Sequence, residues 1–317
     1  MPCTSNSVVL SWLHSVGQAI GSSTKFRQVA AEPSDGDDDE SSHAADEFVT
    51  EVKALLHIAI PTLVIQLGFV VPPFLTASYV GRFFGPIYLD GFQLAYLTIN
   101  LFTLSLLAGL FSASDTLSPQ AFGAGNYREV GVIALRGFVG SMSLILPVCM
   151  ALAFCMADVL VALGEDTEAS QHAADWYRIF LVALPFYGLY MATWKFLSAQ
   201  NVMMPLVIAS VLCIGVILPV SMEVLVKLYG FRGSAMAYAV YQISQAVSLL
   251  LILWLYRPYH DACWPGLVEA WRDVFHWKPF AQFFYLGLGG IVASSECKPA
   301  CCACVLLGSR GQRLTTC

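Results

Sequence analysis

Long apolar segments separated by short polar connectors dominate the sequence from residue 54 onward. Six of them are long enough to cross the roughly 30 Å hydrocarbon core of a bilayer as helices, and a seventh begins at about Phe280. The expected spans are residues 54–79, 87–113, 132–156, 177–201, 203–226 and a sixth that ends near Tyr256. The pattern therefore predicts an all-α integral membrane protein with six transmembrane helices and a partial seventh.

Gln66 and Asn100 are two of the side-chain amides that fall inside the apolar segments. Gln66 lies in the first segment, which also holds Pro61, and Asn100 lies near the middle of the second. An amide in hydrocarbon is costly unless it finds a hydrogen-bond partner. We therefore expect both amides to face the interior of the helix bundle, where they could line a pathway. For Asn100, a plain hydrogen bond between helices is an equal alternative.

A polar stretch, S-A-S-D-T-L-S-P-Q-A-F-G-A-G-N-Y, interrupts the apolar pattern at residues 112–127, which we call the hinge segment. An acid and an amide five residues apart, followed by closely spaced glycines, are typical of a helix end and a change of chain direction. We expect the second helix to end there, with Gly123 in a conformation or a close contact that only glycine allows.

Composition and charge separate the two ends of the chain from the apolar body. With 57% hydrophobic and 12% charged residues, the chain cannot be one soluble domain. The acidic excess lies within residues 32–51, so residues 1–50 are expected to form a disordered cytosolic tail rather than a cleaved signal peptide. Residues 297–317 form a divergent Cys-rich tail, but its cysteines lack the paired C-x-x-C spacing and neighbouring histidines of a metal site. We predict no metal.

Residues 257–279 and 280–296 follow the six-helix region of residues 51–256. The first of them carries Trp264, Trp271 and Trp277 among charged residues and is expected to be an interfacial connector on the cytosolic side. The second is the start of a seventh helix, whose insertion is opposed by Glu296 and Lys298. More basic residues fall in connectors on the side of the amino end than on the other side, which places the amino terminus in the cytosol.

The hinge segment resembles the loop between the second and third helices of the multidrug and toxic compound extrusion (MATE) family, which shows D-T-x-x-x-Q-A-F-G-A followed by a polar residue and an aromatic. The matching residues are Asp115, Thr116, Gln120, Ala121, Phe122, Gly123, Ala124, Asn126 and Tyr127. Lys195 and Gln200 match the family's basic residue and S-A-Q ending of the fourth helix, and Glu296 matches a glutamate of eukaryotic members. Thr76 stands roughly where many bacterial members have an Asp. The resemblance covers about Ala54 to Glu296.

The resemblance implies one lobe of a twelve-helix transporter built from two six-helix lobes. Such a protein would export organic cations or other amphipathic small molecules in exchange for protons or sodium, with no cofactor. Its substrate or ion pathway would include Gln66, Asn100 and Glu296, and Glu296 would take up the coupling proton. Its cytosolic gate or hinge would comprise Asp115, Thr116, Gln120, Gly123, Lys195 and Gln200. The chain is expected to be an incomplete half that needs a second lobe or a homo-oligomer.

Two other classes of function stay open. A non-transporting membrane fragment, or a partner of a full-length transporter, is the first alternative. A seven-helix receptor fits the number of spans, but the acid-Arg-Tyr stretch typical of such receptors is missing after the third span. Neither an enzyme nor a nucleic-acid binder is expected. The predicted location is the plasma membrane or a vacuolar or other internal membrane, with the lipid bilayer and a small-molecule substrate as partners.

Overall fold

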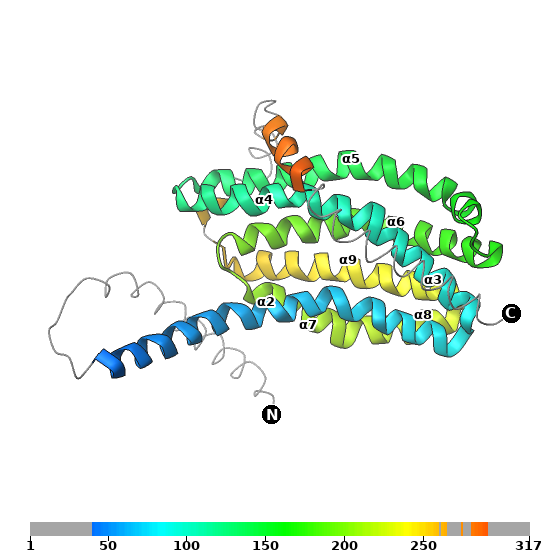
Figure 1. Ribbon diagram of the computed structural model, residues 1–317, viewed down its shortest axis with the longest axis horizontal. Coiled ribbons are helices and arrows are strands. Elements are labelled where there is room, and N and C mark those ends of the chain that lie inside the picture. Colours follow the sequence, from blue (N-terminus) through cyan, green and yellow to red (C-terminus); the bar gives the residue numbers. More distant parts are fainter. Residues whose placement is uncertain (1–39, 260, 265–273, 275–279, 291–317) are drawn as a thin grey trace. The chain divides into compact units, whose positions relative to one another are not determined.

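The computed structural model describes residues 40–259, 261–264, 274 and 280–290, and its regular structure there is entirely helical (Figure 1). The elements are α2 (Glu40–Phe84), α3 (Pro86–Thr98), the π-helix η2 (Ile99–Leu104), α4 (Ser105–Gly123), α5 (Tyr127–Ala162), α6 (Thr167–Ser198), α7 (Met204–Leu212), the π-helix η3 (Cys213–Ile217), α8 (Leu218–Tyr229), α9 (Phe231–Tyr256) and the 3-10 turn η4 (Asp261–Cys263). Residues 280–290 are also helical.

The described residues confirm the six expected membrane spans. They are Ala59–Phe84, Pro86–Gly123, Tyr127–Ala162, Thr167–Ser198, Met204–Tyr229 and Phe231–Tyr256. Residue contacts divide the chain into residues 1–57 and 58–317, and the six-helix bundle belongs to the second unit. In the first unit, α2 already begins at Glu40, so residues 40–50 are helical although their composition predicted disorder.

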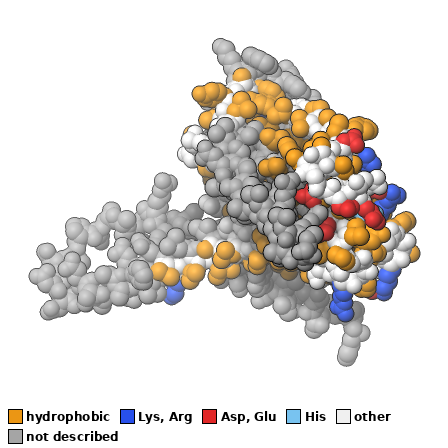
Figure 2. Space-filling view, turned by 45° about the vertical axis from the view of Figure 1, so that its right-hand side comes forward, with side chains coloured by type: hydrophobic (Ala, Val, Ile, Leu, Met, Phe, Trp, Pro, Cys, Tyr) orange, Lys and Arg blue, Asp and Glu red, His pale blue; other side chains and the backbone are white. Residues whose placement is uncertain are grey.

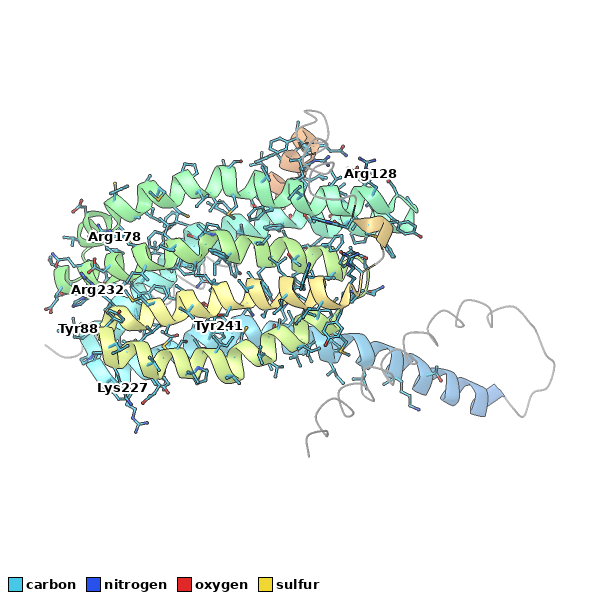
Figure 3. The ribbon with its side chains drawn as sticks, turned by 180° about the vertical axis from the view of Figure 1, so that it is seen from behind. Tyr88, Arg128, Arg178, Lys227, Arg232 and Tyr241 are labelled. Carbon is cyan, nitrogen blue, oxygen red and sulfur yellow. The ribbon has the colours of Figure 1, made fainter. Side chains whose placement is uncertain are left out.

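Successive spans run in opposite directions, so the connections gather at two ends of the bundle. We call one the hinge end; it holds the turns at residues 124–126 and 199–203 and the end of α9 at Tyr256. The other, the opposite end, holds Gly85, residues 163–166 and Gly230. Figure 3 shows Arg178, Arg232 and Lys227 near the opposite end and Arg128 near the hinge end.

The helix α6 is central to the core, because it packs against α3, α5 and α9. Its Trp176 and Tyr177 are almost fully buried. Their polar atoms keep partners inside the bundle: the Trp176 Nε1 donates to Ser234 Oγ of α9 at 3.3 Å, and the Tyr177 hydroxyl lies 3.3 Å from Thr103 Oγ1 of η2. Hydrogen bonds of this kind hold helices together where lipid provides no hydrophobic drive.

Small residues bring α8 and α9 into backbone contact. A Cβ added to Gly233 would overlap the carbonyl of Leu225 and the Cα of Val226. The preceding Gly230 has a φ of 62°, a left-handed conformation that glycine adopts at little cost. The absence of a side chain at Gly233 therefore lets the backbone of α9 lie directly against that of α8.

Candidate functional site

An ion pair at the hinge end joins two helices that are far apart in the sequence. Lys195, near the end of α6, places its Nζ 2.7 Å from Oδ1 and 2.8 Å from Oδ2 of Asp115 on α4. The Lys195 side chain is 16% exposed and the Asp115 side chain 54% exposed. The ammonium also lies 4.6 Å from the centre of the Trp194 ring. The sequence assigned both charged residues to one gate, and the structure places them in direct contact.

The other polar residues of the predicted gate do not join this pair. Thr116 is exposed and donates to the carbonyl of Ser112 in its own helix. The Gln200 side chain donates to the carbonyl of Phe196, so it provides a hydrogen-bond donor for a carbonyl group at the end of α6. Gln120 is exposed and lines a separate cavity. Of these six residues, Asp115 and Lys195 thus form a direct contact between α4 and α6.

The expected helix end within the hinge segment lies later than predicted. The helix α4 continues through Asp115 and Pro119 to Gly123, and the chain turns only at residues 124–126. Gly125, with a φ of 75°, has the left-handed conformation, and the Asn126 N–H donates to the Ala121 carbonyl at 3.0 Å. This is the usual glycine-dependent ending of a helix. Gly123 is helical, and an added Cβ there would meet no atom within 4 Å. Among the described residues, Gly123 therefore has neither the left-handed conformation nor the close contact that the sequence predicted.

The two amides expected in the interior, Gln66 and Asn100, differ in how deeply the structure buries them. Gln66 is exposed on α2, between the buried residues Ile65 and Gly68. Asn100 is half-buried in η2, and its Nδ2 donates to the Tyr96 carbonyl one turn earlier at 2.9 Å. The interior location predicted for Gln66 is therefore wrong within this bundle, and Asn100 satisfies its amide along its own helix rather than across helices.

A buried arginine lies close to the hinge segment. Arg136 of α5 is 3% exposed, and its Nη1 lies 3.2 Å from Oε1 of Glu129, two turns earlier. A cavity of about 290 Å³ adjoins this pair and is also lined by Gln120 and Gln282. The seven-residue spacing of Glu129 and Arg136 was a sequence signal for the pair, since it places both side chains on one face of a helix.

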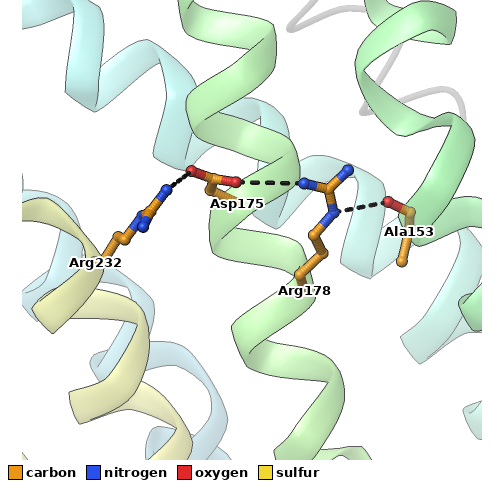
Figure 4. Close-up of polar contacts among 4 residues, drawn as sticks. All are labelled: Ala153, Asp175, Arg178 and Arg232. Atoms are coloured by element: carbon orange, nitrogen blue, oxygen red, sulfur yellow. Dashed lines mark hydrogen bonds and ion pairs between the residues drawn. The ribbon is translucent and has the colours of Figure 1, made fainter.

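A branched polar network fastens the opposite end (Figure 4). Asp175 of α6 accepts from Arg232 of α9 at 2.7 Å and from Arg178 at 3.4 Å. The Nε of Arg178 donates to the carbonyl of Ala153 on α5 at 3.1 Å. The Asp175 carboxylate thus joins α6 to α9, and the neighbouring Arg178 joins α6 to α5. Figure 2 shows acidic and basic side chains gathered at this end among hydrophobic surface.

Glu296, the predicted proton carrier, lies outside the described residues. The helical residues 280–290, which precede it, pack on α4 and α5: Phe283 is buried with Ala113 and Ile133. Within the described part of the chain, no group of three His, Cys, Asp or Glu side chains could hold a metal ion.

Comparisons with known proteins extend these observations. The profile of the MatE family matches residues 47–222. Multidrug and toxin extrusion protein 1 of Rattus norvegicus is 32% identical over 236 residues, which are 74% of this chain and 41% of that protein. The human protein of the same name is 32% identical over 237 residues. The solved eukaryotic MATE transporter AtDTX14 superimposes with a TM-score of 0.68 at 24% identity, over 78% of this chain and 54% of its own. The chain thus spans less than half the length of these curated relatives.

Proposed function

This chain belongs to the MatE family, and from that premise we propose that it forms one lobe of a secondary active antiporter that exports organic cations or other amphipathic small molecules. The observation that carries the proposal is the six-helix bundle, which superimposes on about half of a solved MATE transporter. The relatives named for multidrug and toxin extrusion support the class of cargo. The same membership favours a transporter over a seven-helix receptor.

The substrate pathway is proposed to lie between this lobe and a second one. A cleft needs two walls, and alternating access needs one lobe to move against another. The exposed Gln66 on α2 fits such a wall better than it fits the interior of the bundle, because its amide can meet water or substrate there. The second lobe would come from further residues of the polypeptide or from a second copy of the chain.

We propose that the Asp115–Lys195 pair fastens the gate at the hinge end. The pair is the direct charge contact between α4 and α6 on which the proposal rests, and a movement of either helix would break it. The hinge end would be cytosolic, as the distribution of basic residues favours. Glu296 is proposed to exchange a proton, or sodium, for the exported cation. A membrane carboxyl that alternates between a neutral and a charged state is suited to this exchange.

The test compares two proteins in cells that lack their own exporters. One is the 317-residue chain, and the other is this chain fused to the second six-helix lobe of a relative. Efflux of a fluorescent organic cation is followed with and without a proton gradient. We expect export from the fused protein and none from the chain expressed by itself. Export by the single chain at the rate of the fused one would contradict the two-lobe proposal.

A second candidate function is a membrane partner that does not transport. In this alternative, the six-helix lobe acts beside a full-length relative instead of with a second lobe of its own. Co-expression of the chain with a full-length relative separates the two functions: a partner would copurify with the relative and change its export rate, whereas neither effect is expected of a transporter lobe that works with its own second lobe.

A further inference from the structure

A large cavity opens between α5, α6 and α9 near the hinge end, and the charged residues of the Asp115–Lys195 and Glu129–Arg136 pairs are not among its described lining residues. Its volume is about 800 Å³, within the range of roughly 300–1,000 Å³ that is usual for ligand sites. The helix α6 packs against both α5 and α9 and forms the floor between them. The described lining residues are mostly apolar or aromatic: Ala134, Leu135, Phe138, Leu189, Ala192, Thr193, Phe196, Leu250, Leu253, Trp254, Arg257, Tyr259 and Trp264.

Aromatic rings close the cavity toward the hinge end. Phe196 makes edge-to-face contacts with Tyr259, at 5.7 Å between centroids, and with Trp264, at 6.2 Å. Trp254 lies at the rim and is 72% exposed. Tryptophan and tyrosine are enriched where a membrane protein meets the headgroup region of the bilayer. The closed end of the cavity therefore lies at headgroup level, and its apolar remainder extends along the spans.

The charge of the cavity restricts what it can hold. Arg257 is the cation in the lining, and no acidic side chain is among the described lining residues. Arg257 is exposed and forms no ion pair with any other described residue. A cationic ligand would be repelled by the guanidinium, whereas a phosphate would gain a charge-assisted hydrogen bond. An apolar tail attached to an anionic head matches this arrangement of walls and charge.

We propose that this cavity holds one anionic phospholipid, with an acyl chain between α5, α6 and α9 and the phosphate on Arg257. The lipid comes from the membrane leaflet at the hinge end. Its phosphate would supply a negative partner for Arg257, and its acyl chain would cover the apolar side chains of Leu189 and Leu250. The site does not depend on transport, so it stands or falls independently of the export proposed above.

Native mass spectrometry of the purified 317-residue chain tests the site. The probes are phosphatidylglycerol, phosphatidylcholine with the same acyl chains, and glycerol phosphate without acyl chains. We expect phosphatidylglycerol to be retained in preference to phosphatidylcholine, and glycerol phosphate not to bind. Arg257→Gln should lower retention of phosphatidylglycerol about fivefold, the factor expected for one arginine near an anionic lipid surface. Arg82→Gln, which removes an exposed charge at the opposite end, is the matched control and should change nothing.

Leu189→Trp places a large side chain in the cavity and should reduce retention of both phospholipids. A thermal unfolding curve of each variant shows whether it is folded. If Leu189→Trp does not fold, Arg257→Gln still tests the site, because it changes only an exposed side chain. Equal retention of the two phospholipids by the unmodified chain, or an Arg257→Gln effect no larger than that of Arg82→Gln, would overturn the proposal. Tight binding of glycerol phosphate would assign the site to a soluble anion, and displacement of the lipid by an organic cation would assign it to substrate; both results also overturn it.

Discussion

The two ends of the bundle are fastened by different arrangements of charge. At the opposite end, Asp175 is shared by Arg178 and Arg232, so that α5, α6 and α9 are connected through a network. At the hinge end, α4 and α6 are joined by the ion pair of Asp115 and Lys195. Separation of α5, α6 and α9 would therefore break the Arg232–Asp175 ion pair and the Arg178–Ala153 hydrogen bond at the opposite end, whereas separation of α4 from α6 would break the Asp115–Lys195 ion pair at the hinge end. This difference favours the hinge end as the place where helices move.

Backbone packing also differs between the two ends of the bundle, and it too makes the opposite end the more rigid one. Gly233 lies near the opposite end and brings α9 against the backbone of α8, whereas Gly123 lies at the hinge end with free space around it. A rigid backbone contact resists relative movement, because neither partner is a flexible side chain that can shift. The opposite end is thus held by main chain and charge together.

The largest effect is expected from Gly233→Ala. The added methyl would overlap the Leu225 carbonyl, so α8 and α9 must separate, at a cost of about 1–3 kcal/mol. Thermal unfolding of the purified chain in detergent should show a clearly lower Tm. Gly123→Ala is the matched control; it removes a helix glycine without a clash and should be neutral or stabilising by up to about 1 kcal/mol. Equal Tm changes in the two variants would contradict the difference in packing.

The second effect concerns Asp115→Asn. The substitution leaves the mostly buried Lys195 ammonium beside a neutral amide, which we expect to cost about 1–2 kcal/mol of stability. Lys195→Gln alone should cost less, since Asp115 is half exposed to solvent. The double variant Asp115→Asn/Lys195→Gln should recover part of the loss, because it removes the unpaired charge. Additive losses in a double-mutant cycle would show that the two residues do not interact.

Much of the fold follows from the sequence, since apolar runs of sufficient length specify the six spans. The end of α4 does not, because polar residues usually indicate a loop. Here the hydroxyl of Ser112 donates to the Gly109 carbonyl and that of Thr116 to the Ser112 carbonyl. Hydroxyl groups that are satisfied by their own helix let a polar stretch remain helical.

The residues of the candidate site could be predicted from the sequence only where a family motif contains them. Asp115 and Lys195 were both assigned to the gate from their positions in family patterns, and they are in contact. The network around Asp175 was not foreseen, because Arg232 lies 57 residues away and their contact depends on how α6 packs against α9. The location of Gln66 was predicted wrongly for a related reason. An amide is expected to avoid lipid, but the sequence does not show whether it faces the interior of its own bundle or the wall formed by a second lobe.

A smaller effect is expected from Asp175→Asn. The side chains of Arg178 and Arg232 are more than half exposed, so water already screens both contacts. Each exposed pair contributes about 0.2–1 kcal/mol, and their loss should lower the Tm less than Asp115→Asn does. Glu223→Gln is the control, because its partner Lys227 lies one turn away in the same helix and links no helices. A Tm change for Asp175→Asn equal to that of the control would show that the network does not hold the helices together.

The smallest and most discriminating effect is the response of these variants to salt. Raising the ionic strength from about 0.05 M to 0.5 M shortens the screening length to a few ångströms. Because the two arginine side chains of the network are more than half exposed, we expect the Tm difference between the unmodified chain and Asp175→Asn to shrink with added salt. The difference for Asp115→Asn should persist, since the Lys195 side chain is only 16% exposed and ions cannot surround it. Measuring both variants at the two salt concentrations separates a screened network from a sheltered pair. If both Tm differences disappeared at high salt, the ion pairs at the two ends would be equally weak surface interactions. The Asp115–Lys195 pair would then give no reason to place the gate at the hinge end.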